Sequence, residues 1–163
     1  MTLSPLAPSS FPDMPKIAGI NLATAASGMR YQGRDDLLLI SLAPESSVAG
    51  VFTQSDTAAA PVGWSRKIVE TGTAAAIITN AGNANAFTGQ SGATAVRAIT
   101  SAVAAELSIP EDRVFSSSTG VIGEPLPVDR IDRALKRISD KTRPASWLRA
   151  AQAIGTTDTY PKG

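Results

Sequence analysis

The chain has 163 residues, of which 43% are hydrophobic and 18% are charged, a composition typical of a globular domain that can bury a sizeable core. Its formal net charge is +1 and its basic residues form no cluster, so the sequence gives no reason to expect a nucleic-acid-binding surface. Because the chain has no cysteine and no histidine, it can supply neither disulfides, nor Cys/His zinc sites, nor an imidazole base for nucleophilic catalysis.

The N-terminal part differs from the rest of the chain. The first seventeen residues include four prolines and no long apolar run. We therefore expect a flexible segment over residues 1–17, followed by a single α/β domain over residues 18–163. The segment does not resemble a signal or transit peptide, and no stretch of the chain is long enough to cross a membrane. These observations predict a cytoplasmic protein without membrane contact.

Three strands are expected in the first half of the chain. Residues 36–42 and 48–53 have strand patterns, and the turn residues 44–47 between them predict a hairpin. Residues 74–79 are apolar throughout, so we expect a strand that is buried on both faces. Such a strand, together with an unsupported C-terminal segment, indicates a surface that a partner chain covers.

Helices and one further strand complete the pattern. Helices are expected over residues 61–70, from Ser91 or Gly92 to Leu107, from Pro127 onward, and from Pro144 through Ile154, with a strand over residues 113–118. The side chains expected to be buried in the last helix are Trp147, Leu148 and Ala151. This order of strands and helices predicts a layered α/β fold.

Two runs of small polar residues each follow a β-branched stretch, the first over Asn80–Gly89 and the second over Ser118–Gly123. Small residues that tolerate unusual φ angles, placed directly after a strand, are where folds expose backbone N–H groups to ligands. Either run alone is also typical of an ordinary turn. Three asparagines are costly to bury without partners, so we expect their amides chiefly to satisfy backbone groups of the loop.

The chain closes with the polar segment Thr156–Gly163, which has nothing after it to pack against. A chain that stops within an α/β pattern is expected to be part of a larger polypeptide.

Taken in order, the motifs resemble those of the ornithine acetyltransferase family, the bifunctional glutamate N-acetyltransferases of arginine biosynthesis. One such motif is weak evidence, but six in family order over about 130 residues are specific. The segments that carry the resemblance are Gly33–Leu37, Val48–Thr53, Ala59–Val62, Asn80–Ala86 with Thr88–Gly89, Ser118–Gly123, and Ala153–Ile154 with Thr156–Thr159.

The resemblance implies a layered α/β sandwich of the self-processing, N-terminal-nucleophile-like type. Members are made as a precursor that cuts itself before a threonine, and this chain matches the resulting α chain. The new N-terminal threonine of the β chain takes the acetyl group of N-acetylornithine and passes it to glutamate. Its own α-amine can assist proton transfer, so the chemistry needs no histidine. The resemblance further implies an α2β2 heterotetramer and neither a metal nor a cofactor.

The family's functional residues map onto three positions of this sequence. Thr119 and Gly120 match the threonine and glycine that stabilise the oxyanion, and Thr156 matches a threonine that contacts the substrate. A hydroxyl and an N–H at the end of a strand suit this role, and losing one oxyanion donor typically costs on the order of 3 kcal/mol. The alternative interpretations are a strand-end cap for Thr119 and an ordinary turn for Thr156.

The sequence departs from the family pattern at a few positions. Phe87 stands where the family often has a small residue or cysteine, and Gly155 where it often has methionine. The family's substrate lysine and the self-cleavage threonine should lie beyond Gly163, and we do not assign the lysine's role to Lys162.

Two other classes of function compete with this interpretation. One is a related self-processing amidase or aminopeptidase, in which water accepts the acyl group. The other is a non-catalytic binding domain on the same scaffold. The sequence leaves open the exact acyl donor and acceptor, and whether acetyl-CoA is a second donor.

Overall fold

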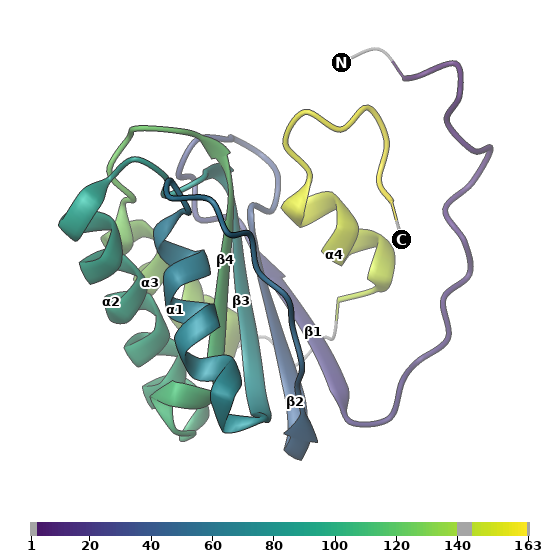
Figure 1. Ribbon diagram of the computed structural model, residues 1–163. Coiled ribbons are helices and arrows are strands. Elements are labelled where there is room, and N and C mark those ends of the chain that lie inside the picture. The colour runs from purple at the N-terminus through teal and green to yellow at the C-terminus, as the bar shows by residue number, and fades with distance from the viewer. Residues whose placement is uncertain (1–2, 140–144, 163) are drawn as a thin grey trace.

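The computed structural model describes residues 3–139 and 145–162, which form a layered α/β domain around one sheet (Figure 1). The strands are β1 (Ile20–Ala25), β2 (Leu37–Ser47), β3 (Thr73–Asn83) and β4 (Val114–Val121). The helices are α1 (Ala60–Ile68), α2 (Gly89–Leu107), α3 (Val128–Ser139) and α4 (Trp147–Ile154), with 3-10 turns at Val69–Thr71 and Glu111–Arg113. The predicted layered α/β class is therefore confirmed.

The sheet has the strand order β1-β2-β3-β4. The pairs β1–β2 and β2–β3 are antiparallel, whereas β3 and β4 are parallel. A parallel pair needs a long crossover, and α2 supplies it. The carboxyl ends of β3 and β4 consequently meet at the same end of the sheet, where the two polar motifs lie.

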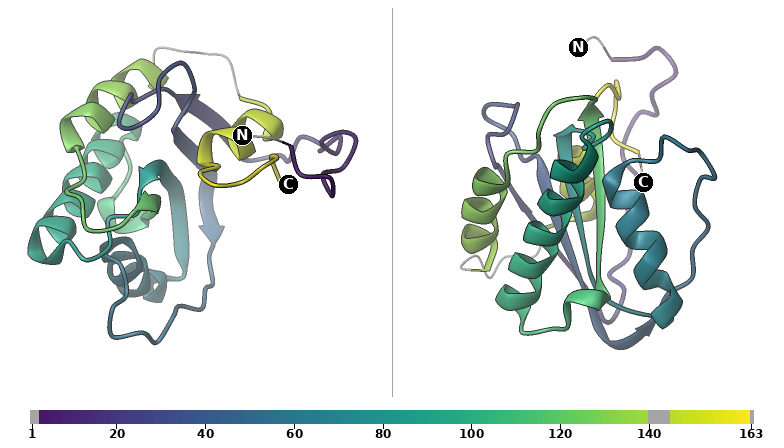
Figure 2. Two further views of the ribbon diagram at one scale, coloured as in Figure 1. Left: turned by 90° about the horizontal axis from the view of Figure 1, so that it is seen from above. Right: turned by 60° about the vertical axis from the view of Figure 1, so that its left-hand side comes forward.

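One face of the sheet packs against α2 and α3, and the opposite face carries α4 (Figure 2). The first interface holds the main core, with residues that include Leu37, Ile78, Val103, Val114 and Ile131. Along β3, buried residues alternate with half-buried ones as far as Thr79, so only one face of this strand is fully covered. The expectation of burial on both faces is therefore wrong, while the partner chain that we inferred from this strand stays a prediction.

Helix α4 packs through its smallest side chains. Ala150 and Ala153 contact Leu22 and Leu38 of the sheet, and Trp147 lies at the margin of this cluster. The predicted buried set of Trp147, Leu148 and Ala151 is wrong, because the helix approaches the sheet along its alanine face and leaves all three half-buried. The predicted start at Pro144 lies outside the described residues; the described helix begins after Ser146, whose hydroxyl accepts a hydrogen bond from the Arg149 N–H at 3.2 Å.

The predicted hairpin between residues 36–42 and 48–53 is wrong. Strand β2 continues through residues 44–47 and pairs with β1 and β3, and residues 48–53 form an irregular segment leading toward α1. Pro44 lies within the register shift between Ser41 and Ser46, where the ladder does not require its missing N–H. Strand β1 was not predicted, because its alanines and asparagine have low strand propensity.

Helix α1 protects the free edge of β4. The Trp64 indole Nε1 donates to the Val114 carbonyl oxygen at 2.8 Å, and the Ser65 hydroxyl donates to the Ser116 carbonyl oxygen at 3.0 Å. These side chains satisfy backbone acceptors that an uncovered edge strand would offer to another chain. The edge strand that carries the second motif is thereby fixed along its first half. Within the described helices, none is both long and apolar enough to cross a membrane.

We expect Trp64→Phe to lower the free energy of unfolding by about 1 kcal/mol, because the buried Val114 carbonyl loses its side-chain donor while the aromatic packing remains. Trp147→Phe is the matched control, since its indole donates to the Pro15 carbonyl at 2.9 Å in an exposed contact. That change should cost less than about 0.5 kcal/mol. Chemical denaturation measures both values, and equal losses would contradict the edge-protection role of α1.

Candidate functional site

The two polar motifs lie side by side at the carboxyl ends of β3 and β4. Their register pairs Asn80 with Ser118, Ala81 with Thr119, and Gly82 with Gly120. We predicted loops directly after shorter strands, but both strands run on into the motifs, through Asn83 and Val121. Parallel pairing thus holds Thr119 and Gly120 as part of the sheet.

Asn80 joins the two motifs directly. Its side chain is 4% exposed, its Nδ2 donates to the Asn83 carbonyl oxygen at 2.8 Å, and its Oδ1 accepts from the Ser118 hydroxyl at 2.6 Å. The residue preceding Thr119 is therefore tied to β3 by a side-chain hydrogen bond as well as by the ladder.

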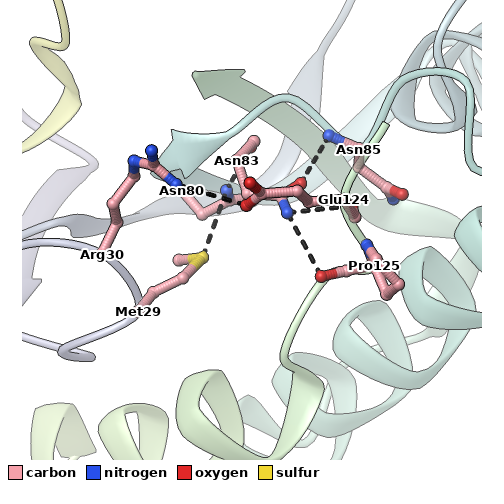
Figure 3. Close-up of polar contacts among 7 residues, drawn as sticks. All are labelled: Met29, Arg30, Asn80, Asn83, Asn85, Glu124 and Pro125. Atoms are coloured by element: carbon pink, nitrogen blue, oxygen red, sulfur yellow. Dashed lines mark hydrogen bonds and ion pairs between the residues drawn. The ribbon is translucent and has the colours of Figure 1, made fainter. Parts of the chain in front are cut away.

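Asn83 and Asn85 shape the turn that follows β3 (Figure 3). The Asn83 amide donates to the carbonyl oxygens of Glu124 and Pro125 at 3.0 and 3.3 Å and accepts from the Asn85 N–H at 2.7 Å. Asn85 is fully buried, and its amide donates to the Gly92 carbonyl oxygen at 3.1 Å. The asparagine amides bond mainly to backbone groups of the chain, as the sequence predicts, which makes their role structural.

Gly82 and Gly120 approach each other more closely than any residue with a Cβ allows. Their φ angles are +112° and +136°, and a Cβ built on Gly120 would lie 2.3 Å from the Gly82 carbonyl carbon. A Cβ on Gly82 would lie 2.9 Å from the Cβ of Arg30, in the loop between β1 and β2. Both positions therefore require glycine, for steric reasons as well as for their backbone angles.

Thr119 presents a hydroxyl that the described residues leave without a hydrogen bond. Its side chain is half-buried and lies on the same sheet face as Ser117, two residues earlier, whose hydroxyl is bonded to that of Thr79 at 2.7 Å. A strand-end cap would bond its hydroxyl to a backbone group, and the described part of the chain shows no such bond. The hydroxyl is therefore free to hydrogen-bond to water or to a ligand.

Thr156 lies in the turn that follows α4. Its backbone N–H donates to the Asp158 carboxylate at 3.4 Å, and its side chain is half-buried. Lys162 makes a close, hydrogen-bonded ion pair with the same carboxylate. The hydrogen bond from Lys162 holds the pKa of Asp158 below its ordinary value, and the bond from the Thr156 N–H lowers it further.

Thr119 and Gly120 are consecutive residues at the end of β4, and Thr156 makes no polar contact with either of them in the described part of the chain. The turn after α4 reaches the same end of the sheet as the carboxyl ends of β3 and β4 (Figures 1 and 2). Among the described residues, no hydrogen bond or ion pair links Thr156 to either of the other two. A cavity of about 690 Å³ beside this turn is lined in part by Arg34, Asp158 and Tyr160 and by none of the three predicted residues.

Arg34 and Gly82 were not identified as functional from the sequence. Arg34 belongs to a motif that served only to support the resemblance, although three charged residues directly before a strand could have indicated a local anchor. Gly82 was noted as part of the asparagine run, but its contact with Gly120 could not be known without the strand register. No cluster of three or more acidic residues that could hold a metal occurs in the described part of the chain.

Gly120→Ala should lower the free energy of unfolding by at least about 3 kcal/mol, because it adds an impossible contact to an unfavourable φ angle. The matched control is Gly123→Ala, since Gly123 has φ +83° and open space around the added Cβ. Backbone strain alone should cost about 1 kcal/mol there. Thermal denaturation compares the two, and similar losses would show that the Gly82–Gly120 contact does not constrain the site.

Comparison with known proteins gives consistent matches along the chain. The model of the ArgJ family matches residues 21–163. The arginine biosynthesis bifunctional protein ArgJ of Bradyrhizobium diazoefficiens is 48% identical over 162 residues, covering 99% of this chain and 39% of the relative. That of Ruegeria pomeroyi is 50% identical over 163 residues, covering 99% of this chain and 40% of the relative. The chain thus spans about two fifths of the length of these relatives.

Solved structures with the same fold carry related names. Ornithine acetyltransferase from Mycobacterium tuberculosis, in complex with ornithine, matches with a TM-score of 0.81 and 37% identity, over 86% of this chain and 77% of that chain. The bifunctional protein ArgJ from Bacillus halodurans matches with a TM-score of 0.79 and 32% identity, over 87% and 74% of the two chains.

Proposed function

Because this chain belongs to the ArgJ family, we propose that it is the α chain of an ornithine acetyltransferase. The complete enzyme moves the acetyl group of N-acetylornithine to glutamate, and a companion β chain from the same precursor supplies the nucleophilic threonine. The relatives are described as bifunctional, so we include acetylation of glutamate from acetyl-CoA as a second activity. The observation that carries the proposal is the Thr119 hydroxyl, which bonds to none of the described residues and lies beside Gly120 where β3 and β4 approach closely.

The proposed reaction has two acyl-transfer steps. The threonine hydroxyl oxygen of the β chain attacks the acetyl carbonyl carbon, its proton passes to the threonine α-amine, and the carbonyl oxygen becomes an oxyanion. Collapse of this intermediate expels ornithine, whose leaving nitrogen takes the proton, and leaves an acetyl ester. The glutamate amine then attacks the ester through a second oxyanion and gives a proton to the α-amine, and the threonine oxygen leaves with that proton.

Thr119 and Gly120 are proposed to stabilise both oxyanions. A donor accelerates the reaction only if it binds the transition state more strongly than the substrate, so its position must be fixed before the charge forms. The Asn80–Ser118 hydrogen bond and the Gly82–Gly120 contact provide this rigidity on either side of Thr119. Thr156 is proposed to contact the substrate from the turn after α4.

Two observations support a companion chain. The aligned part covers most of the solved M. tuberculosis chain but only 39% of the Bradyrhizobium relative, as expected if the solved protein is divided into two chains. Phe87 and Ile122 are 71% and 60% exposed, in neighbouring loops joined by a hydrogen bond from the Gly123 N–H to the Ala86 carbonyl oxygen at 2.9 Å. We propose that the β chain covers these apolar side chains and that two αβ pairs form a heterotetramer.

The 163-residue chain alone should transfer no acetyl group from N-acetylornithine to glutamate, because the proposed nucleophile lies on the β chain. Transfer should appear when the whole precursor is expressed and has cleaved itself, or when the β chain is co-expressed with this chain. An assay of acetylglutamate formation with the purified chain checks this, with the same assay lacking glutamate to detect hydrolysis. Transfer by the isolated chain would refute the two-chain assignment, and release of acetate without transfer in the complete enzyme would favour an amidase.

In the complete enzyme, Thr119→Ala should lower kcat roughly a hundredfold with little change in KM, because the lost interaction strengthens only in the transition state. Ser117→Ala is the matched control: it removes a hydroxyl from the same face of β4 but none that we assign to the reaction. It should keep near-normal kcat. A Thr119→Ala enzyme that is less stable but fully active would remove Thr119 from the site.

A further inference from the structure

We infer that Arg34 is a positioning residue that sets the orientation of Thr156, an inference that rests on the proposed function for its catalytic meaning. The Arg34 Nη2 donates to the carbonyl oxygens of Gln152 and Gly155 at 2.6 and 2.8 Å. The second carbonyl belongs to the peptide group that joins Gly155 to Thr156. The guanidinium therefore holds the backbone unit from which the Thr156 side chain projects.

The end of α4 needs such a partner. If the helix continued, the Thr156 N–H would donate to the Gln152 carbonyl oxygen, but it donates instead to Asp158. Gly155 has φ −66° and ψ 139°, an extended conformation rather than the left-handed one that lets a following backbone N–H cap a helix. Arg34 takes the place of these backbone donors, and one planar group serves two carbonyls.

Arg34 is itself held in place. Its guanidinium carbon lies 4.5 Å from the centroid of the Tyr31 ring, and its Nε donates to the Asp35 carbonyl oxygen at 3.2 Å.

The loop that carries Arg34 is anchored by Asp36, which is fully buried and accepts from the backbone N–H groups of Ser27 and Met29 at 2.5 and 3.3 Å. A continuous set of contacts thus runs from the start of β2 to the Thr156 peptide group.

A second contact between the same loop and α4 offers a matched control. The Asp35 carboxylate accepts from the Thr24 hydroxyl at 2.7 Å and from Arg149 of α4 at 2.6 Å. Arg149→Ala removes a guanidinium that ties this helix to the loop, but it does not touch the Gly155–Thr156 peptide group. It therefore separates loss of docking from loss of positioning.

The test uses the complete two-chain enzyme with Arg34→Ala, Arg34→Lys and Arg149→Ala. Arg34→Ala should raise KM for N-acetylornithine about tenfold with kcat within about twofold, because a charge-assisted hydrogen bond that acts through substrate binding is lost. Arg34→Lys should lie between this variant and the wild type, since an ammonium lacks the planar fork. Arg149→Ala should leave KM unchanged. Arg34→Ala and Thr156→Ala should not add in the double variant, because both remove the same substrate contact.

Amide hydrogen exchange provides a readout that does not depend on activity. The Thr156 amide should exchange about tenfold faster in Arg34→Ala and at the wild-type rate in Arg149→Ala. Unchanged exchange in Arg34→Ala, or equal acceleration in both variants, would overturn the positioning role. A wild-type enzyme without acetyl transfer would refute the proposed function separately, and the exchange comparison decides the role of Arg34 in either case.

Discussion

The contact between Gly82 and Gly120 is the constraint on which the candidate site depends. Two glycines with positive φ angles face each other across the parallel pair β3–β4, so close that a Cβ on Gly120 would lie 2.3 Å from the neighbouring backbone. Such a contact leaves the two strand ends little freedom to slide, and the amide of Asn80 adds a side-chain bond beside it. Thr119 lies between these two restraints, so its hydroxyl is oriented by the sheet rather than by a mobile loop.

Rigidity of this kind is what catalysis without histidine requires. An oxyanion donor contributes by being in place before charge develops, whereas the nucleophile and its base can come from another chain. The same end of the domain carries a second restraint, in which the loop before β2 holds the end of α4 through Arg34. Arg30 and Tyr31 of the same loop lie against Gly82, so the β1–β2 connection contacts both sides of the proposed site. We propose that the α chain supplies the pre-organised oxyanion donors, whereas the β chain supplies the nucleophile.

Periodicity and turn chemistry predicted the helices α1, α2 and α3 and the layered class, because each helix has a clear apolar face or a proline at its start. The same rules failed where tertiary contacts decide. Pro44 suggested a turn but lies within a bulge of β2, and the weakly strand-forming β1 is held by its pairing with β2. Thr119, Gly120 and Thr156 were recognisable only through the family resemblance. The Gly82–Gly120 contact and the Arg34 bonds could not be predicted, since both join residues whose proximity depends on strand register or on the docking of α4.

The proposed oxyanion hole of Thr119 and Gly120 can be seen in a crystal structure of the complete two-chain enzyme with a tetrahedral-intermediate analogue bound to the nucleophilic threonine. We expect the anionic oxygen of the analogue to lie about 2.7–3.1 Å from the Thr119 hydroxyl and from the Gly120 N–H. An analogue whose oxygen is bound by other donors, with the Thr119 hydroxyl left in solvent or bonded within the sheet, would contradict it.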